Sequence, residues 1–253
     1  MPLQMKRVVC AETLKHHNNH TAGRTSVEMR TRLIVCIVIA LLAGCASMGI
    51  LSSAESEFET GLGFFNRGQY DEAIPYFTKA IELDVNYVNA YIYLGRSHLN
   101  MGRWAQAIQP LRTAYRLSPS KTQGEVLNFL IDALLGAAVS DFKNGNFSGA
   151  IGYLKEGLGL DSGSKKILSQ LVAVLIAQGR ELLTQGQVRD AITSFSEAIR
   201  LSPERGDAYL GLARAFFKEG DLLKALDAVE KALRVDPSNS DAELLKKELK
   251  IMP

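Results

Sequence analysis

Five segments of the chain share one pattern of apolar and polar residues, and each segment begins at a glycine. An apolar side chain follows the glycine after two residues and an alanine after five, and a large and a small residue come four and seven positions beyond the alanine. Residues separated by three and four positions form one face of an α-helix. The pattern therefore predicts a helix after each of these glycines, which are Gly68, Gly102, Gly145, Gly186 and Gly220.

The glycines are separated by 34, 43, 41 and 34 residues, which indicates an internal repeat. Each glycine is expected where a preceding helix ends, because glycine adopts a positive φ there without strain. The alanines let two helix axes approach closely, and Pro119, Pro203 and Pro237 end three of the segments. A helix pair that cannot bury its apolar face alone stacks on its neighbours. We therefore predict an all-α helix-turn-helix solenoid of about five repeats.

The repeat resembles that of the tetratricopeptide repeat family. It is most complete in the unit 88–121, through Tyr91, Leu94, Gly95, Gly102, Trp104, Ala107, Leu111, Ala114 and Pro119. The units 54–87, 172–205 and 206–239 also match, and the unit 131–164 is degenerate. The resemblance implies a solenoid of paired helices that recognises other proteins.

Two departures from the 34-residue period lie in the middle of the chain. The surplus is nine residues near 122–130 and seven near 165–171, and both stretches have helical spacing of apolar residues, so we expect lengthened helices. In the same region, Asp141 stands where the family has an aromatic residue. The predicted organisation is units 1 and 2 in 54–121, a degenerate unit 3 with lengthened helices in 122–171, units 4 and 5 in 172–239, and a capping helix in 240–253.

The capping helix is expected to cover the open end of the solenoid. Leu244, Leu245 and Leu249 are assigned to one side of it, and charged residues to the other. A terminal repeat with a polar outer face is what such an end requires for solubility.

The first part of the chain has the order of an export signal. Arg30 and Arg32 precede an eleven-residue apolar run, so residues 29–44 have the composition of a signal peptide. The run ends in Leu42-Ala43-Gly44-Cys45, which resembles the lipobox of bacterial lipoproteins. This resemblance implies cleavage before Cys45 and acylation of Cys45.

Residues 45–53 are then a tether, and no aspartate follows Cys45, which in the lipoprotein family favours the outer membrane over the inner one. We therefore expect a lipid-anchored protein on the periplasmic face of the outer membrane. The alternative is an uncleaved inner-membrane anchor, because residues 33–54 carry no charge and about 20 apolar residues span a bilayer. Residues 1–28 are interpreted as an N-terminal extension ahead of a better start at Met29, and whether they are translated is left open.

The resemblance to tetratricopeptide repeats also implies which side chains line the concave groove. They are the second, fifth, ninth, twelfth and thirteenth residues of the first helix in each unit. The fifth and twelfth are apolar throughout, which fits either ordinary packing or an apolar floor for a peptide. The ninth is arginine in three units, which fits either a solvated helix face or a fork for carboxylates. The candidate groove residues are Phe58, Phe65, Arg96, Leu99, Asn100, Phe142, Arg180, Leu183, Arg214, Phe217 and Lys218.

From the arginines we expect the groove to accept an acidic or C-terminal peptide segment of a partner protein. The carboxylate clamp with which related proteins bind chaperones is not expected, because Phe58 and Leu62 stand where that clamp needs lysine and asparagine.

Composition and charge narrow the classes of function. Hydrophobic residues make up 47% of the 253 residues and charged residues 22%, which is a globular balance. Residues 1–44 hold six basic and two acidic residues, so the remainder has 23 basic and 25 acidic residues and no footprint for nucleic acid. After Cys45 the chain has no cysteine and one histidine, His98, which is expected to pack in the core. We expect no catalysis, cofactor or metal, since the base and the phosphate-binding loops that such sites need are missing.

These observations favour a membrane-tethered scaffold for protein–protein interaction in the bacterial envelope. It would hold a partner peptide or helix in the concave groove, for the assembly of a secretion, pilus or export complex. Pilotin-like lipoproteins are the first guess. The alternatives are a structural subunit of an envelope complex or homo-oligomer, or an adaptor for cell-wall hydrolases.

Overall fold

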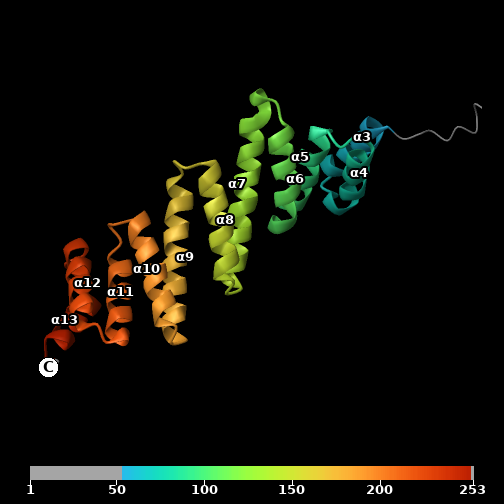
Figure 1. Ribbon diagram of the computed structural model, residues 1–253. Helices are drawn as coiled ribbons and strands as arrows, with labels where there is room; N and C mark the ends of the chain where they lie inside the picture. Colours follow the sequence, from blue (N-terminus) through green and yellow to red (C-terminus); the bar gives the residue numbers. More distant parts are fainter. Residues whose placement is uncertain (1–52, 252–253) are drawn as a thin grey trace, which may run out of the picture. The chain divides into compact units, whose positions relative to one another are not determined.

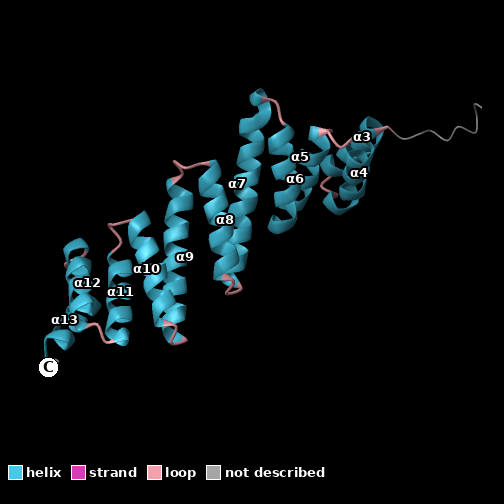
Figure 2. Cartoon of the chain, in the orientation of Figure 1, coloured by secondary structure: helices cyan, strands magenta, loops and turns pink. Residues whose placement is uncertain are grey.

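The computed structural model describes residues 53–251, which form helices joined by short turns (Figure 1, Figure 2). The chain divides into Met1–Ser52 and Ser53–Pro253, and all the described helices belong to the second unit. The expected signal peptide and Cys45 lie outside the described residues. The helices are α3 (Ala54–Asn66), α4 (Tyr70–Leu83), α5 (Val88–Asn100), α6 (Trp104–Leu117), α7 (Ser120–Lys143), α8 (Phe147–Leu160), α9 (Lys165–Thr184), α10 (Val188–Leu201), α11 (Gly206–Glu219), α12 (Leu222–Val235) and α13 (Ser240–Ile251).

The helices form five consecutive pairs followed by a single last helix. Each helix packs against the one before it and the one after it, so the elements from α3 to α13 stand side by side in chain order (Figure 1). Residues 53–251 contain no strand. The predicted all-α helix-turn-helix solenoid of five repeats with a capping helix is therefore confirmed.

The turn inside each pair contains one of the five predicted glycines. Their φ angles lie between 67° and 89°, in the left-handed region that strains other residues. At the end of α11, the backbone N–H of Gly220 donates to the carbonyl of Phe217 and that of Asp221 to the carbonyl of Phe216. These bonds satisfy carbonyls that the helix end leaves unpaired, which is the physical reason for the repeated glycine.

The core follows the repeat of small and large residues. The alanine five residues after each glycine is fully buried in all five pairs, and Phe195 of α10 is also fully buried. A Cβ atom on Gly179 of α9 would lie 2.8 Å from the ring of Phe195, so only glycine leaves room for that ring between the two helices. The close approach of α9 and α10 thus depends on a glycine on one helix and a large ring on the other.

The two surplus stretches lie within helices. α7 has 24 residues and α9 has 20, whereas the other paired helices have 13 or 14. Among residues 53–251, α9 alone has the length and apolar composition to cross a membrane. Leu171, Leu175 and Ile176 of α9 are buried in a cluster shared with α8 and α10, so the apolar character of α9 serves the core.

In the third repeat, Asp141, which stands where the family has an aromatic residue, makes polar contacts at the turn. The side chain of Asp141 accepts a hydrogen bond from Asn146 Nδ2 at 2.9 Å. Asn146 Oδ1 accepts in turn from the backbone N–H of Gly149 at 3.1 Å and so caps α8. The degenerate sequence therefore keeps the turn through a different set of interactions.

The last helix differs from the prediction at one position. Leu245 and Leu249 are buried together with Ala242, but Leu244 is 65% exposed. The assignment of Leu244 to the packed side was wrong, because neighbouring residues on a helix are about 100° apart and Leu245 occupies that side. α13 packs on α12 and covers the end of the solenoid.

Candidate functional site

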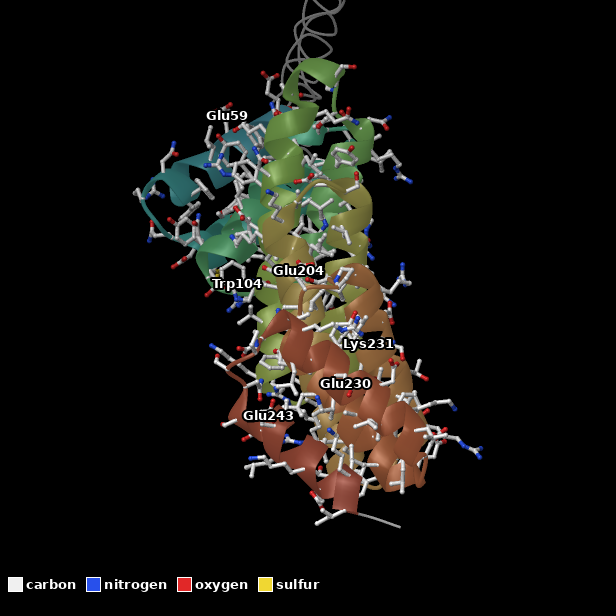
Figure 3. The ribbon with its side chains drawn as sticks, turned by 90° about the vertical axis from the view of Figure 1, so that its left-hand side faces the viewer. Glu59, Trp104, Glu204, Glu230, Lys231 and Glu243 are labelled. Atoms are coloured by element: carbon white, nitrogen blue, oxygen red, sulfur yellow. The ribbon has the colours of Figure 1, made fainter. Side chains whose placement is uncertain are left out.

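The first helices of successive repeats enclose a series of cavities. One of about 440 Å³ lies between α5 and α7, and one of about 670 Å³ is bounded by α5, α7 and α9. A smaller one of about 220 Å³ lies beside α7 and α9, and one of about 470 Å³ lies between α9 and α11. The side chains that project from the stacked helices are drawn in Figure 3, where Trp104 at the start of α6 is labelled.

The predicted groove residues are distributed unevenly over these cavities. Arg96 lines the α5–α7 cavity, Leu99 and Asn100 line the α5–α7–α9 cavity, and Phe142 lines the α7–α9 cavity. Phe58 and Phe65 line none of the four. The α9–α11 cavity brings five of the predicted residues together, namely Arg180, Leu183, Arg214, Phe217 and Lys218.

Phe58 and Phe65 belong to the core of the first two repeats. Phe58 is 5% exposed, and its ring centroid lies 5.1 Å from that of Tyr87 and 5.5 Å from that of Tyr93. Phe65 packs edge-on against Tyr93 with centroids 5.0 Å apart. For Phe58, the alternative of ordinary packing therefore applies, and the expectation of an open groove floor is corrected.

Arg96 has a different environment from the other two arginines. Its guanidinium carbon lies 4.8 Å from the ring centroid of Tyr93 and 5.1 Å from those of Phe65 and Phe129. A cation over aromatic faces is held by the negative potential of the rings. Arg96 is thus engaged by three rings from α3, α5 and α7, in a contact that joins three repeats.

The α9–α11 cavity carries positive charge at its rim. Arg180 and Arg214 are both exposed, and Arg214 Nη2 lies 2.7 Å from Asp241 Oδ2 of α13. Lys218 Nζ donates to the backbone carbonyl of Leu183 at 3.0 Å, in the last turn of α9 where carbonyls lack helical partners. The floor consists of apolar side chains, among which Leu183 and Leu210 are less than 9% exposed.

Asp207 is the acidic residue that lines this cavity, and Arg205 holds it in a two-point contact. Arg205 Nε donates to Oδ1 at 3.0 Å and Nη2 donates to Oδ2 at 2.7 Å. Burial alone would raise the pKa of Asp207, but the hydrogen bonds and charge of Arg205, with the charge of Arg180, lower it below its usual value. The carboxylate of Asp207 is therefore ionised and already paired, which leaves Arg180 available to another anion.

Sequence reasoning missed Thr184 and Asp207 as lining residues. They occupy the thirteenth position of α9's unit and the second position of α11's unit, so the family pattern could have identified both. The family pattern also covers Lys143, the thirteenth residue of the unit 131–164, but it gave no signal for Lys166, which belongs to the surplus residues at the start of α9.

The structure places few groups that could perform chemistry. Residues 53–251 contain no cluster of three histidine, cysteine, aspartate or glutamate side chains able to hold a metal ion. Nδ1 of His98, at the end of α5, is buried and has no hydrogen-bond partner. Burial and the nearby Arg103 lower the pKa of His98, against a smaller opposite effect of Asp71.

Comparison with known proteins places the chain in a family. The family model for the tetratricopeptide repeat matches residues 58–122 and 176–240, slightly more than half of the chain. A TPR repeats protein from Bacteroides fragilis NCTC 9343 has the same fold with a TM-score of 0.58 and 15% identity, over 79% of this chain and 99% of that one. The chain belongs to the tetratricopeptide repeat family.

Curated relatives share the repeats at low identity. DnaJ homolog subfamily C member 3 of Rattus norvegicus is 26% identical over 169 residues, which cover 62% of this chain and 31% of that protein. Hsp70-Hsp90 organizing protein 3 of Arabidopsis thaliana is 32% identical over 71 residues, 28% of this chain and 13% of that protein. The chain thus spans about a third of the first of these relatives and less of the second.

Proposed function

We propose that this tetratricopeptide repeat protein is a membrane-tethered scaffold of the bacterial envelope, which holds an acidic segment of a partner protein in the groove between α9 and α11. Proteins with this fold generally serve protein–protein interaction and are generally not enzymes. The observation that carries the proposal is the convergence of Arg180, Arg214 and Lys218 over one apolar cavity.

The groove suits a peptide with a carboxylate beside an apolar side chain. Arg180 has no carboxylate within 4.0 Å among the described residues. Arg214 forms an ion pair with one exposed carboxylate, that of Asp241. Guanidinium groups bind carboxylates through two parallel hydrogen bonds, which fixes the orientation of the ligand. Leu183, Leu210 and Phe217 supply the apolar contact below the charges.

The tether is proposed from the residues before the repeats. Leu42-Ala43-Gly44-Cys45 supports lipidation at Cys45, and the absence of a following aspartate supports the outer membrane, with the solenoid in the periplasm. Several acyl chains anchor a protein far more firmly than one does. A tethered groove raises the effective concentration of a partner near the membrane, which suits the assembly of a secretion, pilus or export complex.

The groove is tested with a fluorescein-labelled peptide that ends in a leucine followed by two acidic residues and a free C-terminal carboxylate. Arg180→Glu combined with Arg214→Glu should raise the Kd measured by anisotropy about a hundredfold, since each charged hydrogen bond contributes about 1.5–3 kcal/mol. The matched control changes two exposed arginines outside the groove, Arg116→Glu and Arg234→Glu. Equal affinity of both variants, with unchanged circular dichroism, would contradict the proposed groove.

The tether is tested by the intact mass of the mature N-terminus, from a C-terminally tagged chain expressed in its own host. A chain that begins at an acylated Cys45 is expected, and Cys45→Ser should leave the signal peptide uncleaved and the chain without a lipid anchor. A mass that still includes residues 30–44 in the unmutated chain would instead indicate an inner-membrane anchor.

A further inference from the structure

The largest of the four cavities described above adjoins the smallest. The α5–α7–α9 cavity and the α7–α9 cavity share Val139 and Gln170 as lining residues. We call these two adjoining cavities the middle groove. It lies apart from the α9–α11 cavity, with which it shares no lining residue.

Apolar side chains are exposed in the middle groove. Val139 is 40% exposed and Phe142 is 39% exposed, although both belong to a helix whose other large apolar residues are mostly covered. They are three residues apart on α7 and so lie on the same face, one turn after the other. Phe142 is supported from behind by Phe147 of α8, with ring centroids 5.8 Å apart. The two side chains form a fixed apolar ridge at the surface.

Two lysines flank this ridge. Lys143 of α7 and Lys166 of α9 line the groove, and neither has a carboxylate within 4.0 Å among residues 53–251. Asp132 is the acidic residue among those that line the groove. With two unpaired lysines and one aspartate, the rim of the groove therefore has an excess of positive charge.

The groove depends on the residues that depart from the repeat. Lys166 and Gln170 belong to the seven surplus residues 165–171, and Phe129 belongs to the nine surplus residues 122–130. Apart from Leu99, Asn100 and Trp104, the lining residues lie between the two stretches that match the family. The two lengthened helices, α7 of the third repeat and α9 of the fourth, thus supply most of the lining of the middle groove.

We infer that the middle groove binds an amphipathic helix of a partner protein, with apolar residues one turn apart and acidic residues on both flanks. The apolar ridge of Val139 and Phe142 provides the contact for the apolar stripe of such a helix, which packs by its i, i+3, i+4 and i+7 side chains. Lys143 and Lys166 provide the opposite charges for its flanks. This site goes beyond the proposed α9–α11 groove and does not depend on it.

A designed peptide of about 18 residues serves as the probe, long enough for about five helical turns. It carries leucines on one helical stripe, glutamates on both flanks and a fluorescein label, and a second version carries lysines in place of the glutamates. Fluorescence anisotropy with the full chain should show saturable binding of the acidic version and a Kd at least about tenfold higher for the basic version.

Two sets of variants separate the apolar and the charged contributions. Val139→Gln with Phe142→Gln should weaken binding of the acidic peptide about tenfold, whereas Leu223→Gln, at a leucine of α12 that is 83% exposed, should have no effect. Lys143→Glu with Lys166→Glu should reverse the preference, so that the basic peptide binds more tightly. If the two lysines contributed only to folding, the double lysine variant would bind both peptides more weakly, and by the same factor.

The inference would be overturned by no saturable binding of the acidic peptide, by no reversal in the double lysine variant, or by self-association of the chain that the same glutamine variants abolish. Binding of the unmutated chain to anionic phosphatidylglycerol vesicles but not to the peptide would also overturn it, in favour of a lipid surface. The variant with Arg180→Glu and Arg214→Glu should bind the acidic helix as tightly as the unmutated chain does. The two proposed sites are therefore tested independently of each other.

Discussion

The same helix position carries an arginine in the second, fourth and fifth repeats, but the two halves of the solenoid use it differently. Arg96 is stacked among three aromatic rings, whereas Arg180 and Arg214 stand exposed at the rim of a cavity. The difference shows that a repeat position determines where a side chain lies, and that the neighbouring repeats determine what it can do.

The neighbours of Arg96 explain why it is held. Phe65 comes from the preceding repeat and Phe129 from the surplus residues of α7, so the three rings around it derive from three repeats. The cavity that Arg180 lines contains Phe195 and Phe217 beside Leu183 and Leu210, yet among the described residues the guanidinium of Arg180 makes no cation–π contact. Without such a contact, the guanidinium of Arg180 is open to carboxylates.

In the core, the first and fourth repeats pack in the same way. Truncating the large buried side chain of either repeat should have the largest effect on stability. Phe77 and Phe195 are equivalent, fully buried and in contact with a glycine of the paired helix. Phe77→Ala and Phe195→Ala should each lower the free energy of unfolding by about 3–5 kcal/mol, measured by urea denaturation. A loss for only one of them would show that the halves differ in their cores as well as in their grooves.

The register of the fourth repeat gives a smaller expected effect. Ala191 is fully buried between α9 and α10, so Ala191→Phe should overpack the contact and lower the free energy of unfolding by about 1–3 kcal/mol. Ser196→Phe introduces the same ring at an exposed position of α10 and should leave the melting temperature nearly unchanged. Equal melting temperatures of the two variants would mean that the helix pair can separate to admit the ring.

The sequence predicts the helix pairs well because the determinants of each pair are local. The five glycines sit at positive φ and the alanines five residues later are buried, since a turn and a close helix contact impose the same demand in every repeat. The capping helix was correctly expected, but Leu244 was not separated from Leu245, because both belong to a run of apolar residues whose rotation depends on α12.

The groove was predicted less completely because its surfaces are made by contacts between repeats. Three of the residues that the periodic pattern assigned to the groove, Arg180, Leu183 and Arg214, line one cavity, and their role in binding stays a prediction. It did not separate Phe58 and Arg96 from them, since the rings that cover these two residues come from other repeats. Lys166 carried no signal, because it belongs to residues that the repeat lacks.

The comparison between the arginines is tested directly by single substitutions. Arg96→Gln removes the cation from three rings and should lower the free energy of unfolding by about 0.5–2 kcal/mol. Arg180→Gln touches no such contact and should change it by less than about 0.5 kcal/mol. Equal losses in urea denaturation would show that the aromatic surroundings of Arg96 contribute nothing to stability.

The smallest expected effect is a dependence of stability on pH that comes from the N-terminal half. The pKa of His98 is lowered from the ordinary 6.5 in the folded chain, first by burial and then by the charge of Arg103. Between the folded and unfolded pKa values the unfolded chain binds more protons, so the free energy of unfolding should decrease as the pH falls below about 6.5. It should level off below the folded pKa.

His98→Phe should remove this decrease, because the ring fills a similar space and does not titrate. Urea denaturation of both chains at about pH 7.5 and about pH 5.5 measures the slope, at values where paired carboxylates contribute little. Asp207, for example, has a pKa below its ordinary 3.8 and loses its contribution only in more acidic solution. A slope that persists unchanged in His98→Phe would mean that groups other than His98 cause it, and that the burial of His98 at the end of α5 does not make stability depend on pH.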